Sequence, residues 1–145
     1  MGLHVVVCDD EAHIVRAIEM KLSKAGIPVK TARDGESGWK LISKHPPGAV
    51  VTDWQMPRLS GLELIKRIRS NETTKSVPVI LLTAKGFELD EQELIKQFNV
   101  TKVLVKPFSP RELLKHVLQL LRNKSLYAGA VTPRPCELSS LTTFS

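Results

Sequence analysis

Asp9, Asp10, Asp53, Thr83 and Lys106 follow short apolar runs of this chain, and their side chains together could act on a phosphate. Carboxylates a few ångströms apart repel one another, so three acids brought together either keep a proton or bind a hard cation. No Cys or His belongs to this set, and oxygen ligands with room for water favour Mg²⁺ over a softer metal. The residue types therefore indicate a magnesium site with a hydroxyl and an ammonium beside it.

In-line phosphoryl transfer needs this combination of groups. The reaction requires a nucleophilic oxygen, a cation that joins it to the phosphate, and donors for the remaining phosphoryl oxygens. An ammonium suits a phosphate as a compact donor, and a neighbouring hydroxyl can bind a further oxygen. We therefore expect Asp53 to be the nucleophile, forming an aspartyl phosphate, with Thr83 and Lys106 acting beside it.

Each residue also has a simpler interpretation when it is considered alone. Asp10 could cap a helix that begins near Glu11, with Asp9 solvated. Thr83 could be an N-cap or a turn hydroxyl, and Lys106-Pro107 could form an ordinary turn. These alternatives require chance to have placed every group at a different strand end, so the combined pattern favours the phosphoryl-transfer site.

Short β-branched runs alternate with helical patterns along the chain. The expected strands are His4–Cys8, Val29–Ala32, Ala49–Thr52, Val77–Leu82 and Lys102–Val105. These runs are nearly continuous in apolar character, which is typical of parallel strands covered on both faces. Apolar residues at helical spacing separate them, beginning with Ile14, Ala17, Ile18, Leu22 and Ala25. The alternation predicts an α/β doubly wound (βα)5 fold of the flavodoxin-like class, with a five-stranded parallel sheet and helices on both faces.

Turn and capping residues agree with this plan. Gly26 and Pro28 end the first helix, and Asp34-Gly35 indicates a turn. Ser109-Pro110 opens a last helix that we expect to continue to about Asn123. Right-handed crossovers place the carboxyl ends of all parallel strands along one edge of the sheet, so the five reactive side chains are expected to meet there.

Composition limits the class of protein. With 42% hydrophobic and 25% charged residues, the 145-residue chain predicts one domain over residues 1–123, followed by a flexible tail or linker over residues 124–145. No apolar run approaches the roughly 18 residues of a membrane helix, and no secretory signal precedes the first acids, so we expect a cytoplasmic protein. Lys and Arg are scattered despite a net charge of +6, which argues against direct nucleic-acid binding.

The sequence around the reactive residues resembles the receiver domains of two-component response regulators. In size, the chain is most similar to the chemotaxis-type, single-domain members of this family. The likeness rests on the segments Val5–Glu11, Asp53–Pro57, Leu82–Ala84 and Val105–Phe108, and it spans roughly Leu3 to Asn123. All five signature positions are filled in order. The resemblance implies Mg²⁺-dependent phosphorylation of an aspartate that switches the binding of partners.

The resemblance also implies a set of metal ligands. Asp10, Asp53 and the backbone carbonyl of Gln55 would hold Mg²⁺, and Asp9 would act through a water molecule on the metal. The phosphoryl donor would be a histidine kinase, a histidine phosphotransfer protein or a small acyl phosphate. A downstream effector protein would then recognise the phosphorylated form.

The phosphoryl group itself would be bound by Thr83, by Lys106 and by the backbone at Gln55 and Ala84. The Lys106-Pro107 peptide would be cis. The domain would catalyse the transfer and its own slow dephosphorylation, although the resemblance describes a signalling phospho-acceptor rather than an enzyme.

Four features depart from the pattern of the family or add to it. Val103 stands three positions before the lysine, where an aromatic switch residue is usual, so another element would have to report the phosphate. Phe98-Asn99-Val100 replaces the usual Gly-Ala before the fifth strand, and Lys85 stands two residues after Thr83. The last helix is apolar over more than one face, which predicts a homodimer or a partner contact, through Leu113, Leu114, Val117, Leu118, Leu120 and Leu121.

Other functions agree less well with the residues. A flavodoxin-like cofactor binder would need a Thr-, Ser- and Gly-rich loop after the first strand, and a dinucleotide oxidoreductase would need Gly-x-Gly-x-x-Gly. An aspartate-nucleophile phosphatase would carry Asp-x-Asp after the first strand, where this chain has adjacent acids. Two alternatives stay open, namely the receiver part of a longer DNA-binding regulator or hybrid kinase, and an interaction module that works without phosphorylation.

Overall fold

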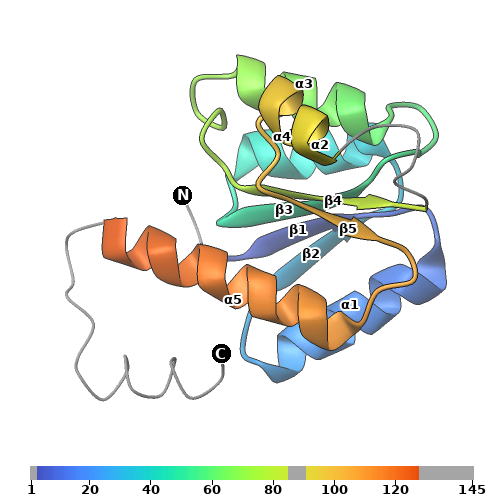
Figure 1. Ribbon diagram of the computed structural model, residues 1–145, viewed down its shortest axis with the longest axis vertical. Coiled ribbons are helices and arrows are strands. Elements are labelled where there is room, and N and C mark those ends of the chain that lie inside the picture. The colour runs from blue at the N-terminus through green and yellow to red at the C-terminus, as the bar shows by residue number, and fades with distance from the viewer. Residues whose placement is uncertain (1–2, 85–90, 128–145) are drawn as a thin grey trace.

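A parallel sheet forms the centre of the fold. The computed structural model describes residues 3–84 and 91–127, and in them five strands have the order β2-β1-β3-β4-β5 (Figure 1). The strands are β1 Val5–Cys8, β2 Val29–Ala32, β3 Ala49–Asp53, β4 Val79–Thr83 and β5 Lys102–Val105. The helices are α1 Ala12–Lys24, α2 Gly35–Lys44, α3 Gly61–Ser70, α4 Glu91–Phe98 and α5 Pro110–Tyr127. The predicted (βα)5 architecture is confirmed.

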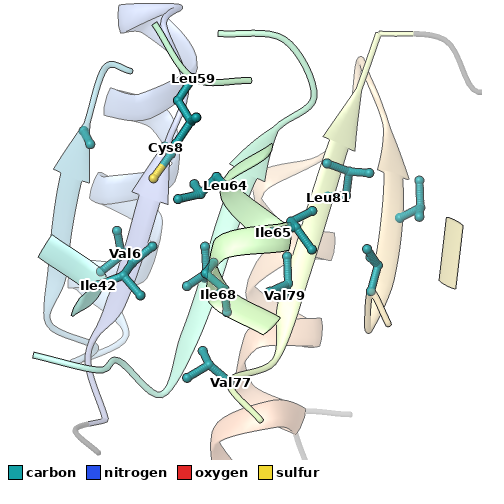
Figure 2. Packing of buried hydrophobic residues seen from close by; sticks show 14 residues of the cluster. Val6, Cys8, Ile42, Leu59, Leu64, Ile65, Ile68, Val77, Val79 and Leu81 are labelled. Carbon is teal, nitrogen blue, oxygen red and sulfur yellow. The ribbon is translucent and has the colours of Figure 1, made fainter. Parts of the chain in front are cut away.

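Helices cover both faces of the sheet. Figure 1 shows α1 and α5 on one face and α2, α3 and α4 on the other. Each face has its own hydrophobic cluster, because alternate residues of a strand point to opposite sides. In Figure 2 the α3 side chains Leu64, Ile65 and Ile68 face the strands that carry Val6 and Leu81. Burial on both faces explains why the strands read as continuous apolar runs.

Four strand ends differ from the sequence prediction by one or two residues, and the first of them is the start of β1 at Val5 rather than His4. The fourth strand begins at Val79 rather than Val77, because Pro78 has no N–H to donate to the ladder and supplies only its carbonyl. At their other ends, β3 and β4 each continue for one residue and include Asp53 and Thr83. Asp53 and Thr83 therefore lie on the last positions of their strands and share the rigidity of the sheet.

Capping residues begin the helices as their types suggest. Asp34, Ser60 and Ser109 each accept a hydrogen bond from a backbone N–H two or three residues later, at 2.8, 3.2 and 3.1 Å. Asp34-Gly35 is therefore the start of α2 as well as a turn. Gly26, with a φ of 82°, follows α1, as the expected helix end required.

The buried stripe of α1 differs slightly from the prediction. Val15, Ile18 and Leu22 are buried, whereas Ala17 and Ala25, which were expected on this face, are exposed. The larger side chains remove more apolar surface from water, so the helix turns them and not the alanine methyl groups toward the sheet.

The last helix is longer than predicted. It runs to Tyr127 rather than to about Asn123, because no Gly or Pro interrupts this stretch and each added residue gains a helical hydrogen bond. The predicted tail thus begins with one more helical turn, and residues 128–145, like Lys85, lie outside the described residues. Within the described ranges, no helix combines the length and apolar character that a membrane span requires.

Candidate functional site

The carboxyl edge of the sheet brings the predicted residues together. The residue before Asp9 pairs with the residue before Asp53, so Asp9, directly after β1, lies beside Asp53 at the end of β3. Thr83 pairs with Val105, which places Lys106 beside the end of β4. The N–H of Lys106 donates to the Thr83 carbonyl at 2.7 Å, and this bond extends the ladder past the last residue of β5.

Asp9, Asp10 and Asp53 form a cluster that could hold a metal ion. One carboxylate oxygen from each lies within 4.8 Å of the other two. Asp9 is fully buried and Asp53 is nearly so, whereas Asp10 is exposed. The simpler interpretation of the acid pair is wrong, because Asp9 is buried, and α1 begins at Ala12 with Glu11 as its N-cap residue and no side-chain capping hydrogen bond.

Lys106 is the counter-charge of this cluster. Its Nζ lies 3.0 Å from Asp9 Oδ2 and 3.3 Å from Asp53 Oδ1. A third carboxylate, Glu11 Oε1, lies closer still at 2.9 Å. Burial acts to lower the pKa of Lys106, but the three carboxylates outweigh it and raise the pKa above its usual value. The ammonium is therefore firmly charged and fixed among acids.

Asp53 is the acid whose ionisation the fold opposes most clearly. Burial and the charge of Asp9 raise the pKa of Asp53 to about 6, although Lys106 and the Trp54 N–H act in the opposite direction. The Trp54 N–H donates to Asp53 Oδ1 at 2.9 Å. At neutral pH the carboxylate is mostly ionised but poorly solvated, a state that bound cations stabilise.

The remaining predicted residues lie at the ends of β3, β4 and β5 or within two residues after them. Thr83 is buried at the end of β4, and Ala84 follows it on the surface. Gln55 is exposed in the connection between β3 and α3, two residues after Asp53. The Lys106-Pro107 peptide is cis, as the resemblance implied.

A close backbone contact positions the connection after β3. Gly61 lies so near Asp53 that a Cβ added there would be 1.9 Å from the Asp53 carbonyl oxygen. The Gly61 N–H donates to the Trp54 carbonyl at 2.7 Å. Only glycine allows this approach, which folds the connection carrying Gln55 back over the strand end.

Two departures in the sequence acquire a structural meaning. Val103 is buried and belongs to the hydrophobic cluster on the α3 face, so its position is filled by core packing. Asn99 has a φ of 53°, a left-handed conformation that glycine adopts most easily. Asparagine is among the other residues that tolerate this conformation best, which explains how it can replace the usual glycine here.

Glu11 is the residue that sequence reasoning missed. Its carboxylate reaches Lys106, which lies 95 positions further along the chain. The only sequence signal was its place directly after the acid pair, and a helix-start position for an acid is common without any such contact.

The comparisons with known proteins agree with this geometry. The model of the response regulator receiver domain matches residues 5–118. The chain belongs to the response regulator receiver family. Among curated relatives, this receiver is 34% identical to the phosphate regulon transcriptional regulatory protein PhoB of Pseudomonas aeruginosa over 84% of the chain and 53% of PhoB. It is 33% identical to the chemotaxis protein CheY1 of Helicobacter pylori, over 82% of the chain and 96% of CheY1.

A solved structure extends the comparison to three dimensions. The receiver domain of the sensor histidine kinase PA1611 from Pseudomonas aeruginosa is 26% identical and has a TM-score of 0.74, covering 83% of this chain and 98% of that one. That structure is described with a magnesium ion coordinated in its active-site cleft. The receiver spans about half the length of PhoB, and nearly all of CheY1.

Proposed function

We propose that this receiver accepts a phosphoryl group on Asp53 in a Mg²⁺-dependent reaction and thereby switches its binding of partner proteins. The observation that carries the proposal is the placement of Asp53 Oδ1 at 3.3 Å from Lys106 Nζ within a cluster of carboxylates. A nucleophilic oxygen, a metal-binding set and a fixed cation thus occupy one edge of the sheet, as phosphoryl transfer requires.

The donor set fits Mg²⁺. The ligand atoms that the cluster offers are all carboxylate oxygens, and the exposed Asp10 leaves that side open to water. Asp10, Asp53 and the carbonyl of Gln55 would hold the ion, with Asp9 acting through a bound water. When bound, Mg²⁺ would neutralise negative charge shared between Asp53 and an incoming phosphate. The ion in the related PA1611 domain supports this assignment.

The protein side chains supply the other parts of the reaction. Asp53 attacks phosphorus, the bond from phosphorus to the donor nitrogen or acyl oxygen breaks, and the donor leaves with that electron pair. Lys106 and the Thr83 hydroxyl bind oxygens of the transferred group, and the backbone at Gln55 and Ala84 supports it. Hydrolysis of the aspartyl phosphate at the same site returns the protein to its resting state.

The partners follow from the same chemistry. A histidine kinase or a histidine phosphotransfer protein would supply the phosphoryl group, and an effector protein would read the product. A homodimer through α5 is a further candidate, although Leu113 and Val117 are buried and Leu114, Leu118, Leu120 and Leu121 already pack partly on the core. Because the chain covers about half of PhoB, it also fits the receiver part of a longer transcriptional regulator.

Intact-mass measurement tests the proposal. The protein is incubated with Mg²⁺ and a small acyl phosphate, and we expect a labile gain of one phosphoryl group. The gain should vanish without Mg²⁺ and in Asp53→Asn, but not in Glu19→Gln, which removes an exposed charge from α1. A folded protein that gains no mass, and that beryllofluoride with Mg²⁺ leaves unchanged, would instead be an interaction module that works without phosphorylation.

A further inference from the structure

Glu11 lies outside the metal cluster yet makes the shortest contact of Lys106. The Glu11 Oε1 to Lys106 Nζ distance is 2.9 Å, compared with 3.0 Å to Asp9 and 3.3 Å to Asp53. An ammonium has three N–H groups, and three carboxylates surround this one. Of the three contacts, only the one to Glu11 has the geometry of a hydrogen bond, and Asp9 Oδ2 has no hydrogen-bond donor among the described residues, so Glu11 holds the Lys106 donor in the resting site.

The backbone of Glu11 holds this side chain in place. Its N–H donates to Asp9 Oδ1 at 2.9 Å, and its carbonyl accepts the first hydrogen bonds of α1, from Ile14 and Val15 at 3.1 and 3.2 Å. The position of Glu11 is therefore tied both to the buried acid and to the helix. Its carboxylate can move without disturbing either attachment, because the side chain alone reaches across to Lys106.

The three carboxylates differ in how easily they can leave Lys106. The Asp9 side chain is fully buried and that of Asp53 is 10% exposed, whereas that of Glu11 is 45% exposed. A buried carboxylate that loses its cation pays a large desolvation cost, but an exposed one is hydrated again by water. Glu11 is thus the carboxylate that an incoming anion can displace.

We propose that Glu11 is a built-in competitor for Lys106, a positioning residue that occupies the ammonium until a phosphoryl group replaces it. This inference rests on the proposed function of Asp53. Glu11 then lowers the affinity of the resting site for a phosphoryl group and keeps Lys106 oriented toward the cluster. The same carboxylate adds negative charge near the metal ligands, so it raises the affinity for Mg²⁺ while it lowers the affinity for the anion.

Titration with beryllofluoride, an analogue of the phosphoryl group, tests the competition. The affinity is measured at saturating Mg²⁺ by tryptophan fluorescence, and the affinity for Mg²⁺ alone is measured separately. In Glu11→Ala we expect beryllofluoride to bind about two- to fivefold more tightly, the range that an exposed ion pair allows. Glu11→Gln, which keeps the size and an acceptor oxygen, should show a smaller gain, and Mg²⁺ should bind both variants no more tightly than the wild type.

A matched control variant distinguishes a role of Glu11 from a general effect of removing a negative charge. Glu19→Gln removes the same charge from an exposed site on α1 and should leave both affinities unchanged. Looser folding around α1 in a Glu11 variant would lower the affinity for both Mg²⁺ and beryllofluoride, whereas loss of the competitor raises the affinity for beryllofluoride alone. If the wild type binds beryllofluoride and both Glu11 variants bind it equally or less well, Glu11 is not a competitor. If the wild type binds none, the phospho-acceptor function fails, and the role of Glu11 fails with it.

Discussion

Two half-buried cations lie at opposite edges of the sheet and have opposite kinds of partners. At the amino edge, Arg69 donates to the backbone carbonyls of Lys75, Val77 and Asn99 at 2.9, 2.7 and 2.7 Å. At the carboxyl edge, Lys106 is surrounded by carboxylates. The carbonyls that accept hydrogen bonds from Arg69 are neutral and belong to fixed backbone. The partners of Lys106 are charged side chains, and two of them, Asp9 and Asp53, belong to the cluster that could hold a metal ion.

The difference separates a structural site from a reactive one. The planar guanidinium of Arg69 ties the end of α3 to the connections before β4 and β5, and nothing in that arrangement needs to change. Around Lys106, negative charge exceeds positive charge, so the resting site is incomplete until a cation joins it. A sheet of this kind can therefore have one edge that holds the fold together and another that is less stable and available for chemistry.

The largest expected effect comes from breaking the amino edge. Arg69→Ala leaves three carbonyls without a donor and should lower the free energy of unfolding by about 2–4 kcal/mol. Urea denaturation measures this loss. The stability of Arg69→Lys should lie between those of the wild type and Arg69→Ala, because an ammonium cannot donate to all three carbonyls as the planar guanidinium does. Beryllofluoride affinity of the folded fraction should match the wild type, and a large loss of affinity would show that the two edges are coupled.

A gain of stability is expected at the carboxyl edge from Asp53→Asn. The folded pKa of about 6 lies above the ordinary value of 3.8, so the folded protein binds more protons than the unfolded chain between these two values. Stability therefore falls as the pH rises through that window, and the cost is complete above about pH 6. Without metal at pH 7.5, Asp53→Asn should be more stable by about 3 kcal/mol.

The pH and metal dependence of this gain provide its control. Below about pH 4 the gain should disappear, because Asp53 is then protonated in both states. Mg²⁺ should reduce the gain at pH 7.5, since it stabilises the wild-type carboxylate and has fewer ligands in the variant. A gain that is equal at pH 4 and pH 7.5 would mean that the carboxylate is not strained by burial.

The smallest expected effect concerns backbone strain beside the site. Arg58 has a φ of 70° in the connection between β3 and α3, and its guanidinium lies 3.9 Å from Asp34 at an exposed position. Such an ion pair contributes little, whereas asparagine tolerates this conformation better than arginine. Arg58→Asn should raise the free energy of unfolding by about 0.5 kcal/mol in thermal or urea denaturation. A loss of stability would mean that the ion pair with Asp34 stabilises the fold more than the backbone conformation of Arg58 destabilises it.

Local patterns in the sequence were sufficient for the order of elements and for most of the site. Continuous apolar runs, turn residues such as Gly26, and an acid, hydroxyl or ammonium at four strand ends are all visible in the local sequence. The right-handed crossover then brings those strand ends together. The last residues of β3 and β4 could not be predicted from local patterns. Asp53 and Thr83 belong to their strands because they pair with residues of a neighbouring strand. The length of α5, by contrast, follows from a local feature, because no Gly or Pro occurs between Arg111 and Tyr127.

Contacts between distant parts of the chain were decided by the tertiary structure alone. Neither the bond of Arg69 to Asn99 nor that of Glu11 to Lys106 has a local signal, since each joins residues 30 or 95 positions apart through flexible side chains. Burial of Asp9 likewise follows from packing around the strand end. The residue types at the strand ends determined which chemistry was available, and only the folded chain decided which charges would compete for Lys106, because electrostatic energy depends on distance in space and on exclusion of water.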